Sequence, residues 1–119
     1  MGYTYLASPY SHKSAKVRKY RFETIVDIAA KLLAQGETVF CPIAHTYPIE
    51  LSDYLPEDKK YDGTFWLKHD YELLDKAKRL VVVKMKGWEK SKGIFGEIAY
   101  AKFKNIPIYY LDPDTMNYD

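Results

Sequence analysis

The apolar run Leu80-Val81-Val82-Val83 is the feature that most constrains the fold of this chain. A strand without alternating polar side chains is typical of a sheet that is covered on both faces, as parallel sheets are. Segments with helical spacing precede and follow the run, and other strand-like segments alternate with them. The run therefore predicts an α/β fold, in which helices cover both faces of a parallel sheet.

Four strand-like and three helix-like segments alternate along the chain. In order, we predict strand 3–7, helix 13–35, strand 38–41, helix 65–78, strand 80–85, helix 93–104 and strand 106–111. Residues 43–61 are interpreted as a long loop and 112–119 as a peripheral tail. Because crossovers are right-handed, few arrangements remain. We expect a flavodoxin-like or Rossmann-like three-layer sandwich, with a mainly parallel sheet of about four strands in the order 2-1-3-4, and a single domain over residues 1–119.

Composition excludes several classes of function. The net charge is only +2, without the basic excess of proteins that bind nucleic-acid duplexes. The lone cysteine, Cys41, excludes an internal disulfide and a Cys-rich zinc site, and no His/Asp/Glu spacing resembles a zinc or iron site, so no metal is expected. No apolar stretch approaches the ~20 residues of a membrane span. The chain opens directly into a strand-like segment rather than a signal peptide, so we expect a cytoplasmic protein with no membrane partner.

The loops that follow the first three strands are the expected place for a ligand. In open α/β sheets, ligands bind outside the carboxyl ends of the strands, at the point where the strand order reverses. The predicted order brings segments 8–10, 41–45 and 87–97 around one cleft at that point.

Hydroxyl and basic groups follow the first strand. Ser8 and Tyr10, on either side of Pro9, could bind a phosphate or a sugar, with Arg18 or Arg21 in the next helix as a charge partner. The alternative for most of the lysines and arginines of this helix is a solvated face.

A glycine-containing loop leads into the third predicted helix. Gly93 and Gly96 permit close backbone approach, and a helix N-terminus offers free N–H groups to an anion. The hydroxyl of Ser91 could donate to a phosphate, although an ordinary loop serine is the alternative. His45, after the second strand, is a candidate ligand or proton carrier.

Two carboxylates, Glu97 and Asp70, are the candidate catalytic residues. Glu97 is expected near a helix start, where the macrodipole favours an ionised carboxylate, and such a group can attack a sugar carbon. If the helices flank the same edge of the sheet, Asp70 faces Glu97 across a small ligand and donates or accepts a proton. The alternatives are a helix-start residue stabilised by the dipole for Glu97, and a solvated helix position for Asp70, which spacing alone favours.

Taken together, these segments resemble the nucleoside 2-deoxyribosyltransferase superfamily over nearly the whole chain, from Tyr5 to about Leu111. Three segments carry the resemblance. The segment Tyr5-Leu6-Ala7-Ser8-Pro9-Tyr10 is similar to the opening strand and loop of the superfamily. The segment Gly93-Ile94-Phe95-Gly96-Glu97-Ile98-Ala99-Tyr100-Ala101 is similar to its signature G-x-x-x-E-x-G-Y-A, and Asn105-Ile106-Pro107-Ile108 resembles the segment that follows the signature. Ala99 replaces the usual glycine. The compact length and the Ser-Pro-Tyr opening are also similar to a small, mostly phage-associated branch.

The resemblance implies a role for each candidate. The glutamate at the position of Glu97 is the superfamily's nucleophile, Asp70 matches the acid that handles the base, and Tyr5 is expected to position Glu97 through a hydrogen bond. Ser91 stands where members that act on free nucleosides carry aspartate and nucleotide-hydrolysing members carry serine. An aspartate would repel a 5′-phosphate, whereas a serine hydroxyl donates to it. The resemblance therefore points to nucleoside 5′-monophosphates.

The expected function is an N-glycosidase, or a transferase, that cleaves the N-glycosidic bond of (deoxy)nucleoside 5′-monophosphates through a glutamyl-glycosyl intermediate. It needs no metal and no organic cofactor, and its partner is a small-molecule nucleotide. The alternatives are a non-catalytic nucleotide-binding module, since fold does not determine function, and a structural protein with a decayed site. A homodimer or higher homo-oligomer is expected, because Trp66, Trp88 and Tyr109 need cover and sites in this family are often completed by a neighbouring subunit.

Overall fold

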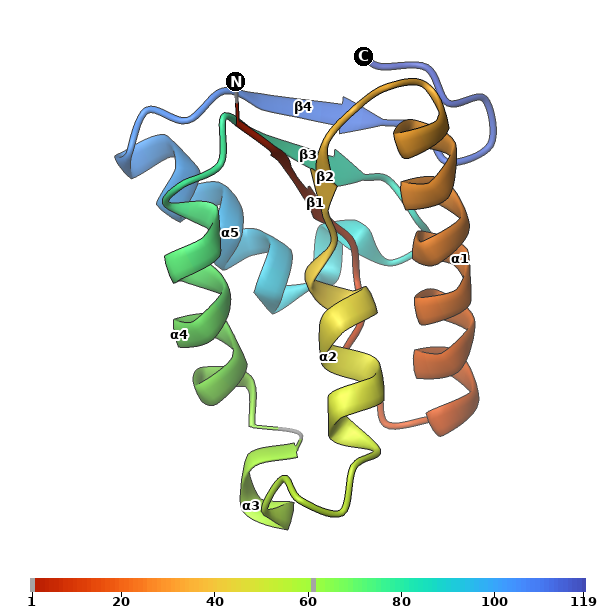
Figure 1. Ribbon diagram of the computed structural model, residues 1–119, viewed down its shortest axis with the longest axis vertical. Helices are drawn as coiled ribbons and strands as arrows, with labels where there is room; N and C mark the ends of the chain where they lie inside the picture. Colours follow the sequence, from red (N-terminus) through yellow and green to blue (C-terminus); the bar gives the residue numbers. More distant parts are fainter. Residues whose placement is uncertain (1, 61) are drawn as a thin grey trace.

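The computed structural model describes residues 2–60 and 62–119 (Figure 1). Its elements, in chain order, are β1 (Thr4–Ala7), α1 (Ala15–Ala34), β2 (Val39–Phe40), α2 (Pro42–Glu50), α3 (Glu57–Lys60), α4 (Gly63–Leu74), β3 (Arg79–Val83), the 3₁₀ helix η1 (Trp88–Lys90), α5 (Lys92–Phe103) and β4 (Ile108–Leu111). The strands pair in parallel in the order β2-β1-β3-β4. Figure 1 shows α1 on one side of the sheet and α4 and α5 on the other. This is the predicted three-layer α/β sandwich, with the predicted strand order.

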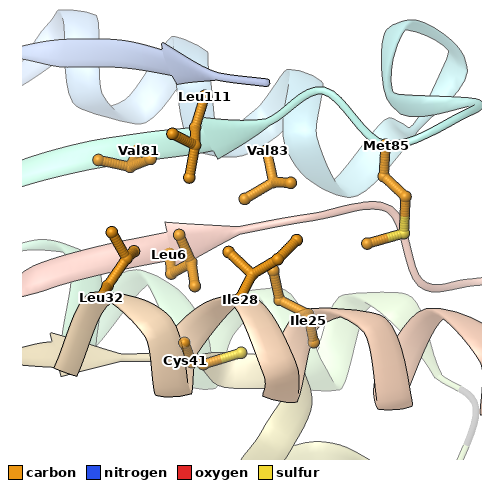
Figure 2. Close-up of a cluster of buried hydrophobic side chains, with 10 residues drawn as sticks. Leu6, Ile25, Ile28, Leu32, Cys41, Val81, Val83, Met85 and Leu111 are labelled. Carbon is orange, nitrogen blue, oxygen red and sulfur yellow. The ribbon is translucent and has the colours of Figure 1, made fainter. Parts of the chain in front are cut away.

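The central strands β1 and β3 are buried on both faces, because successive side chains point to opposite sides of a strand. The cluster on the α1 side includes Leu6, Ile25, Ile28, Leu32, Val81, Val83 and Leu111 (Figure 2). The cluster on the α4 and α5 side includes Tyr5, Ala7, Leu74, Leu80, Val82, Ile94 and Ala101. Full burial of one Val or Leu side chain stabilises a fold by roughly 1.5–3 kcal/mol. These two clusters therefore fix the position of the β1–β3 pair. They also fix the carboxyl-terminal end of these strands, where the strand order reverses.

Helix α1 lies within two residues of its predicted bounds at both ends. Ser14 caps its first turn by accepting a hydrogen bond from the Val17 N–H at 3.4 Å, as short polar side chains do at this position. Gly36, just beyond the C-cap residue Gln35, has a φ of 93°, a left-handed conformation that favours glycine. In the part of the chain that the structure describes, no helix is both long and apolar enough to cross a membrane.

The long loop predicted over residues 43–61 is wrong, because this segment contains α2 and α3. The proline that opens α2 stands at the first helical position, where a missing N–H costs nothing. A second proline, Pro48, lies inside α2 and gives up one helical hydrogen bond. Both residues are typical helix breakers, and they hid the helix from sequence inspection. Tyr61, the last residue of the predicted loop, lies outside the described residues.

Two other expectations from the sequence need correction. Helix α4 begins at Gly63 rather than residue 65 and ends at Leu74 rather than residue 78, with Asp62 capping its first turn. Trp66 was expected to be exposed, but it is only 9% exposed, and its indole N–H donates to the carbonyl of Lys60 at 2.9 Å. It therefore does not call for cover by a second subunit, whereas Tyr109 is 43% exposed.

The tail after β4 folds back along its own strand. Tyr118 forms an antiparallel bridge with Leu111, and its ring lies 5.4 Å from the guanidinium of Arg79. Asp119 forms an ion pair with Lys84. These contacts hold the last two residues against the β3 and β4 part of the same chain.

Candidate active site

A cavity of about 1120 Å³ opens beside the point where the strand order reverses. The loops after β1 and β3, helices α2 and α4, and the start of α5 all contribute to its wall. The wall includes these predicted site residues: Ser8, Tyr10, Arg18, Asp70, Ser91, Gly93 and Glu97. Small-molecule sites commonly measure about 300–1,000 Å³, so the space is sufficient for a nucleoside monophosphate.

Glu97 is buried in the second turn of α5, which corrects its expected place at the helix start. The helix begins at Lys92, so Glu97 is its sixth residue, beyond the first turn in which the macrodipole acts. It shares the buried face of α5 with Ile94 and Ala101, and it is 6% exposed. Burial raises the pKa of Glu97 to about 8. Desolvation, rather than the helix dipole, therefore decides its charge.

Tyr5 holds the Glu97 carboxyl group from the sheet side. Its phenolic hydroxyl donates to Oε2 of Glu97, so the predicted hydrogen bond is present. Burial raises the pKa of Tyr5 well above its ordinary value, and the charges of Glu97 and Asp70 add to the increase. The hydroxyl thus stays protonated near neutral pH and stabilises the ionised form of Glu97.

Asp70 is buried, and the prediction from spacing that it is a solvated helix position is wrong. It is 8% exposed and lies on the buried face of α4 with Trp66 and Leu74, at a spacing of four residues. Leu67, Tyr71, Leu74 and Ala77 also share a face at helical spacing, but of these only Leu74 and Ala77 are buried, whereas Leu67 and Tyr71 are partly buried. A polar residue between two large apolar residues in a helical repeat is a signal that could have located it.

A histidine pair supports Asp70. The Nδ1 atom of His69 lies 3.1 Å from Oδ1 of Asp70, and the His69 ring stacks on His45 with centroids 5.2 Å apart. Burial raises the pKa of Asp70, while the hydrogen bond to His69 and the charges of both histidines oppose the increase. His45 is exposed and, like the buried Pro9, is absent from the described part of the cavity wall. His45 therefore stacks on His69 outside the described cavity wall, and its charge acts on Asp70 from there.

The two carboxyl groups affect each other as well as sharing a wall. After burial, the charge of Asp70 is the other influence that raises the pKa of Glu97. Like charges in a poorly hydrated site disfavour double ionisation. A pKa of about 8 leaves about one tenth of Glu97 ionised at pH 7. Near neutral pH, the pair therefore holds a proton that can be shared with a ligand.

Two serine hydroxyls and a helix start form the polar wall near these acids. The Oγ atom of Ser91 accepts from the Ile94 N–H at 3.2 Å, which leaves its own proton free to donate. Ser8 is 6% exposed, and its Oγ has no hydrogen-bond partner among the described residues. An unsatisfied buried hydroxyl costs about 1–3 kcal/mol. Gly93 lies in the first turn of α5, where backbone N–H groups lack helical acceptors.

Gly96 sets the approach of α4 to α5. A Cβ atom at this position would clash with the hydroxyl oxygen of Tyr71, whose ring stacks on Tyr100 with centroids 4.9 Å apart. The missing side chain lets α4 pack closely on α5. Because Asp70 lies on α4 and Glu97 on α5, this packing also sets the spacing of the two acids.

Thr46 and Glu50 are site residues that sequence inspection missed. Both are buried on α2 and line the same cavity. Their spacing of four residues would have marked a shared helix face if the prolines of α2 had not masked the helix. Among residues 2–60 and 62–119, no group of three His, Cys, Asp or Glu side chains could hold a metal ion.

Stability should fall as pH rises from about 5 to 8, and Glu97 is the main cause. Its pKa is about 8 in the folded protein, against an ordinary value of 4.5, so the folded state binds more protons across this interval. A raised folded-state pKa gives stability that is lost as pH rises toward that pKa. Urea unfolding of the wild type and of Glu97→Gln at pH 5, 6.5 and 8 measures this effect. Between pH 5 and pH 8, we expect the unfolding free energy of the wild type to fall by about 2–4 kcal/mol relative to that of Glu97→Gln.

The control for this measurement is Glu72→Gln, at an exposed position of α4. Its unfolding free energy should follow the wild type at every pH. Equal pH dependence of the wild type and Glu97→Gln would contradict the raised pKa of Glu97.

Comparison with known proteins places the chain in a family. No curated protein matches the sequence. The family model described as "Domain of unknown function (DUF1937)" matches residues 2–112. The matched segment spans every strand of the sheet and every residue of the cavity wall. The chain therefore belongs to the DUF1937 family.

Proposed function

We propose that the protein is an N-glycosidase that releases the base from (deoxy)nucleoside 5′-monophosphates. The observation that supports this function is the pair of buried carboxyl groups, Glu97 and Asp70, on the wall of one cavity, with the Tyr5 hydroxyl donating to Glu97. A protein that only holds a phosphate gains nothing from two carboxyl groups beside an anion. Two acids flanking one sugar are what glycoside cleavage uses.

In the first step, the ionised carboxylate of Glu97 attacks C1′ of the sugar. A bond forms between Oε of Glu97 and C1′, and the bond between C1′ and the base nitrogen breaks. The electron pair of that bond leaves with the base, and Asp70 supplies a proton to the base or stabilises a base that is already protonated. The products are the free base and a glycosyl ester on Glu97.

In the second step, water attacks C1′ and releases the sugar phosphate. Asp70, which has given up its proton, can now accept one from the water, as the acid of a retaining glycosidase does. The ester bond breaks, and its electron pair returns to Glu97. If a second base enters in place of water, the same site acts as a transferase.

The raised pKa of Glu97 is compatible with its role as a nucleophile. At pH 7, ionising a group with a pKa of about 8 costs about 1.4 kcal/mol. This is small beside the 8 kcal/mol or more by which enzymes lower a barrier. A single proton shared by the pair gives the required state when it resides on Asp70, and the Tyr5 hydrogen bond favours that state.

The polar wall suits a 5′-phosphate. Ser91 has a proton to donate, the unpartnered hydroxyl of Ser8 can be satisfied by a phosphate oxygen, and the start of α5 attracts an anion. Arg18 lines the same cavity, but its charge acts on Glu50 and is not counted among the phosphate-binding groups. Nucleoside monophosphates should therefore be better substrates than free nucleosides.

Base release from a panel of ribo- and deoxyribonucleoside 5′-monophosphates, followed by chromatography, tests the function. The matching free nucleosides serve as the comparison. We expect free base from at least one monophosphate and at least tenfold less from its nucleoside. Saturable binding with no base released from any compound would contradict catalysis and leave a nucleotide-binding module as the function.

A further inference from the structure

Helix α2 brings two buried polar side chains to the cavity that the proposed reaction does not use. Thr46 and Glu50 are 4% and 3% exposed, and both line the cavity that contains Glu97. They lie four residues apart, so their Cβ atoms are about 5–6 Å apart on one helix face. Glu50 is eight residues beyond Pro42, and this places it about 12 Å further along the axis of α2 from the end of the sheet.

The hydroxyl of Thr46 has no hydrogen-bond partner in the described structure. Buried polar atoms are nearly always paired in native proteins, so an unpaired atom on a cavity wall needs an explanation. A bound ligand that presents a polar atom to Oγ1 would supply the missing partner.

Glu50 is held as a hydrogen-bond acceptor. Burial raises the pKa of Glu50, while the hydroxyl of Tyr10, which donates to its Oε1 atom, and the contacts with Arg18 and Trp66 oppose the increase and favour the ionised form. An ionised carboxylate has about four lone-pair sites, so it has capacity for two more donors. Trp66 is buried and lines this end of the cavity from α4, which adds a large apolar surface beside the acid.

We propose that Thr46 and Glu50 recognise the base of the nucleotide, and that this base carries the 2-amino-6-oxopurine edge of guanine. The inference rests on the proposed function, which puts the sugar at Glu97 and leaves the base to extend along the cavity. Guanine presents N2–H and N1–H side by side, and both can donate to one carboxylate. Its O6 atom follows on the same edge and can accept from the Thr46 hydroxyl.

Other bases fit this pair of groups less well. Adenine and cytosine place a ring acceptor beside their amino group, so one carboxylate oxygen would face a lone pair. Hypoxanthine and uracil present a single ring N–H. A site with a buried polar group left unpaired discriminates strongly against the ligand that lacks the matching atom.

The test compares guanosine and inosine 5′-monophosphates, which differ only by the 2-amino group. For the wild type we expect kcat/KM to be about 10²-fold higher for the guanine compound. Glu50→Gln keeps the shape of the side chain and an oxygen for Tyr10, but its NH₂ group opposes the donors of guanine. This variant should lower the preference at least tenfold. Glu23→Gln, at an exposed position of α1, should leave the preference unchanged.

Thr46→Val is a second variant, and it should stabilise the free protein but weaken its recognition of guanine. Removal of an unpaired buried hydroxyl should raise the Tm of the free protein by about 2–4 °C. The same change should raise KM for guanosine monophosphate several-fold, with little effect on 2-aminopurine riboside monophosphate, which carries only hydrogen at C6. A higher Tm with weaker guanine recognition supports a ligand-binding role for this hydroxyl.

Calorimetric titration of both nucleotides into the wild type and Glu50→Gln separates this inference from the proposed function. Guanine-selective binding that depends on Glu50, without base release, would support the inference and refute the glycosidase. Base release with no preference for guanine over hypoxanthine would overturn the inference and leave the glycosidase standing. An equal loss on every base in Glu50→Gln, or a loss confined to ribonucleotides, would also overturn it, because the carboxylate would then serve structure or the sugar.

Discussion

Replacement of Glu97 by glutamine should reduce base release from nucleoside 5′-monophosphates by about 10⁴-fold or more. The amide has the same shape and can still accept from the Tyr5 hydroxyl, but its oxygen is a poor nucleophile toward C1′. No glycosyl ester would then form. Chromatography of the free base measures the loss, and circular dichroism with thermal unfolding shows that the variant stays folded.

The matched control for this variant is again Glu72→Gln. It makes the same chemical change at an exposed site and should retain wild-type turnover. Undiminished base release by Glu97→Gln would refute the assigned nucleophile.

Replacement of Asp70 by asparagine should reduce base release by about 10²–10⁴-fold, the usual contribution of a positioned proton donor. The loss should depend on the leaving group. An N7-methylated purine already carries a positive charge and departs without a proton from the protein. In the first turnover on such a nucleotide, before water resolves the ester, we expect Asp70→Asn to lose less than tenfold in the rate of base release, whereas Glu97→Gln should be inactive on both substrates.

The comparison of the two substrates distinguishes proton transfer from structural support. Asp27→Asn, at an exposed position of α1, is the control and should match the wild type. If Asp70→Asn lost the same activity on the methylated and unmethylated nucleotides, its role as a proton donor would be wrong.

The sheet was predictable from the sequence because its signals are local and strong. The run Leu80–Val83 required cover on both faces, and parallel pairing with right-handed crossovers left few strand orders. The position of Glu97 in the helix after this strand followed from the same pattern. These features depend on burial that apolar side chains alone specify.

The electrostatics of the site could not be predicted in the same way. Glu97 was expected to be ionised by a helix dipole, but it lies in the second turn of α5, and burial raises its pKa to about 8. Spacing alone favoured a solvated position for Asp70, although it is buried on the wall of a cavity that α2 and α4 form together. The spacing of Trp66, Asp70 and Leu74 could have indicated a buried face of α4, but local spacing does not show the cavity itself.

Helix α2 is the largest omission, and its cause is local. Prolines at positions 42 and 48 suggested a loop, although one stands where a helix tolerates it and tertiary packing offsets the cost of the other. Without α2, the face that carries Thr46 and Glu50 could not be recognised. The sequence alone therefore did not predict the part of the site that we propose recognises the base.

The most direct test of the account is to trap the glycosyl ester on the protein. A nucleoside monophosphate with fluorine at C2′ destabilises positive charge at C1′ and slows hydrolysis of the ester, so that the intermediate accumulates. Tryptic cleavage then separates Glu97, in peptide 93–102, from Asp70, in peptide 69–76. We predict that the mass of the fluorinated sugar phosphate is added to peptide 93–102. Its addition to peptide 69–76, or base release with no adduct on either peptide, would contradict the account.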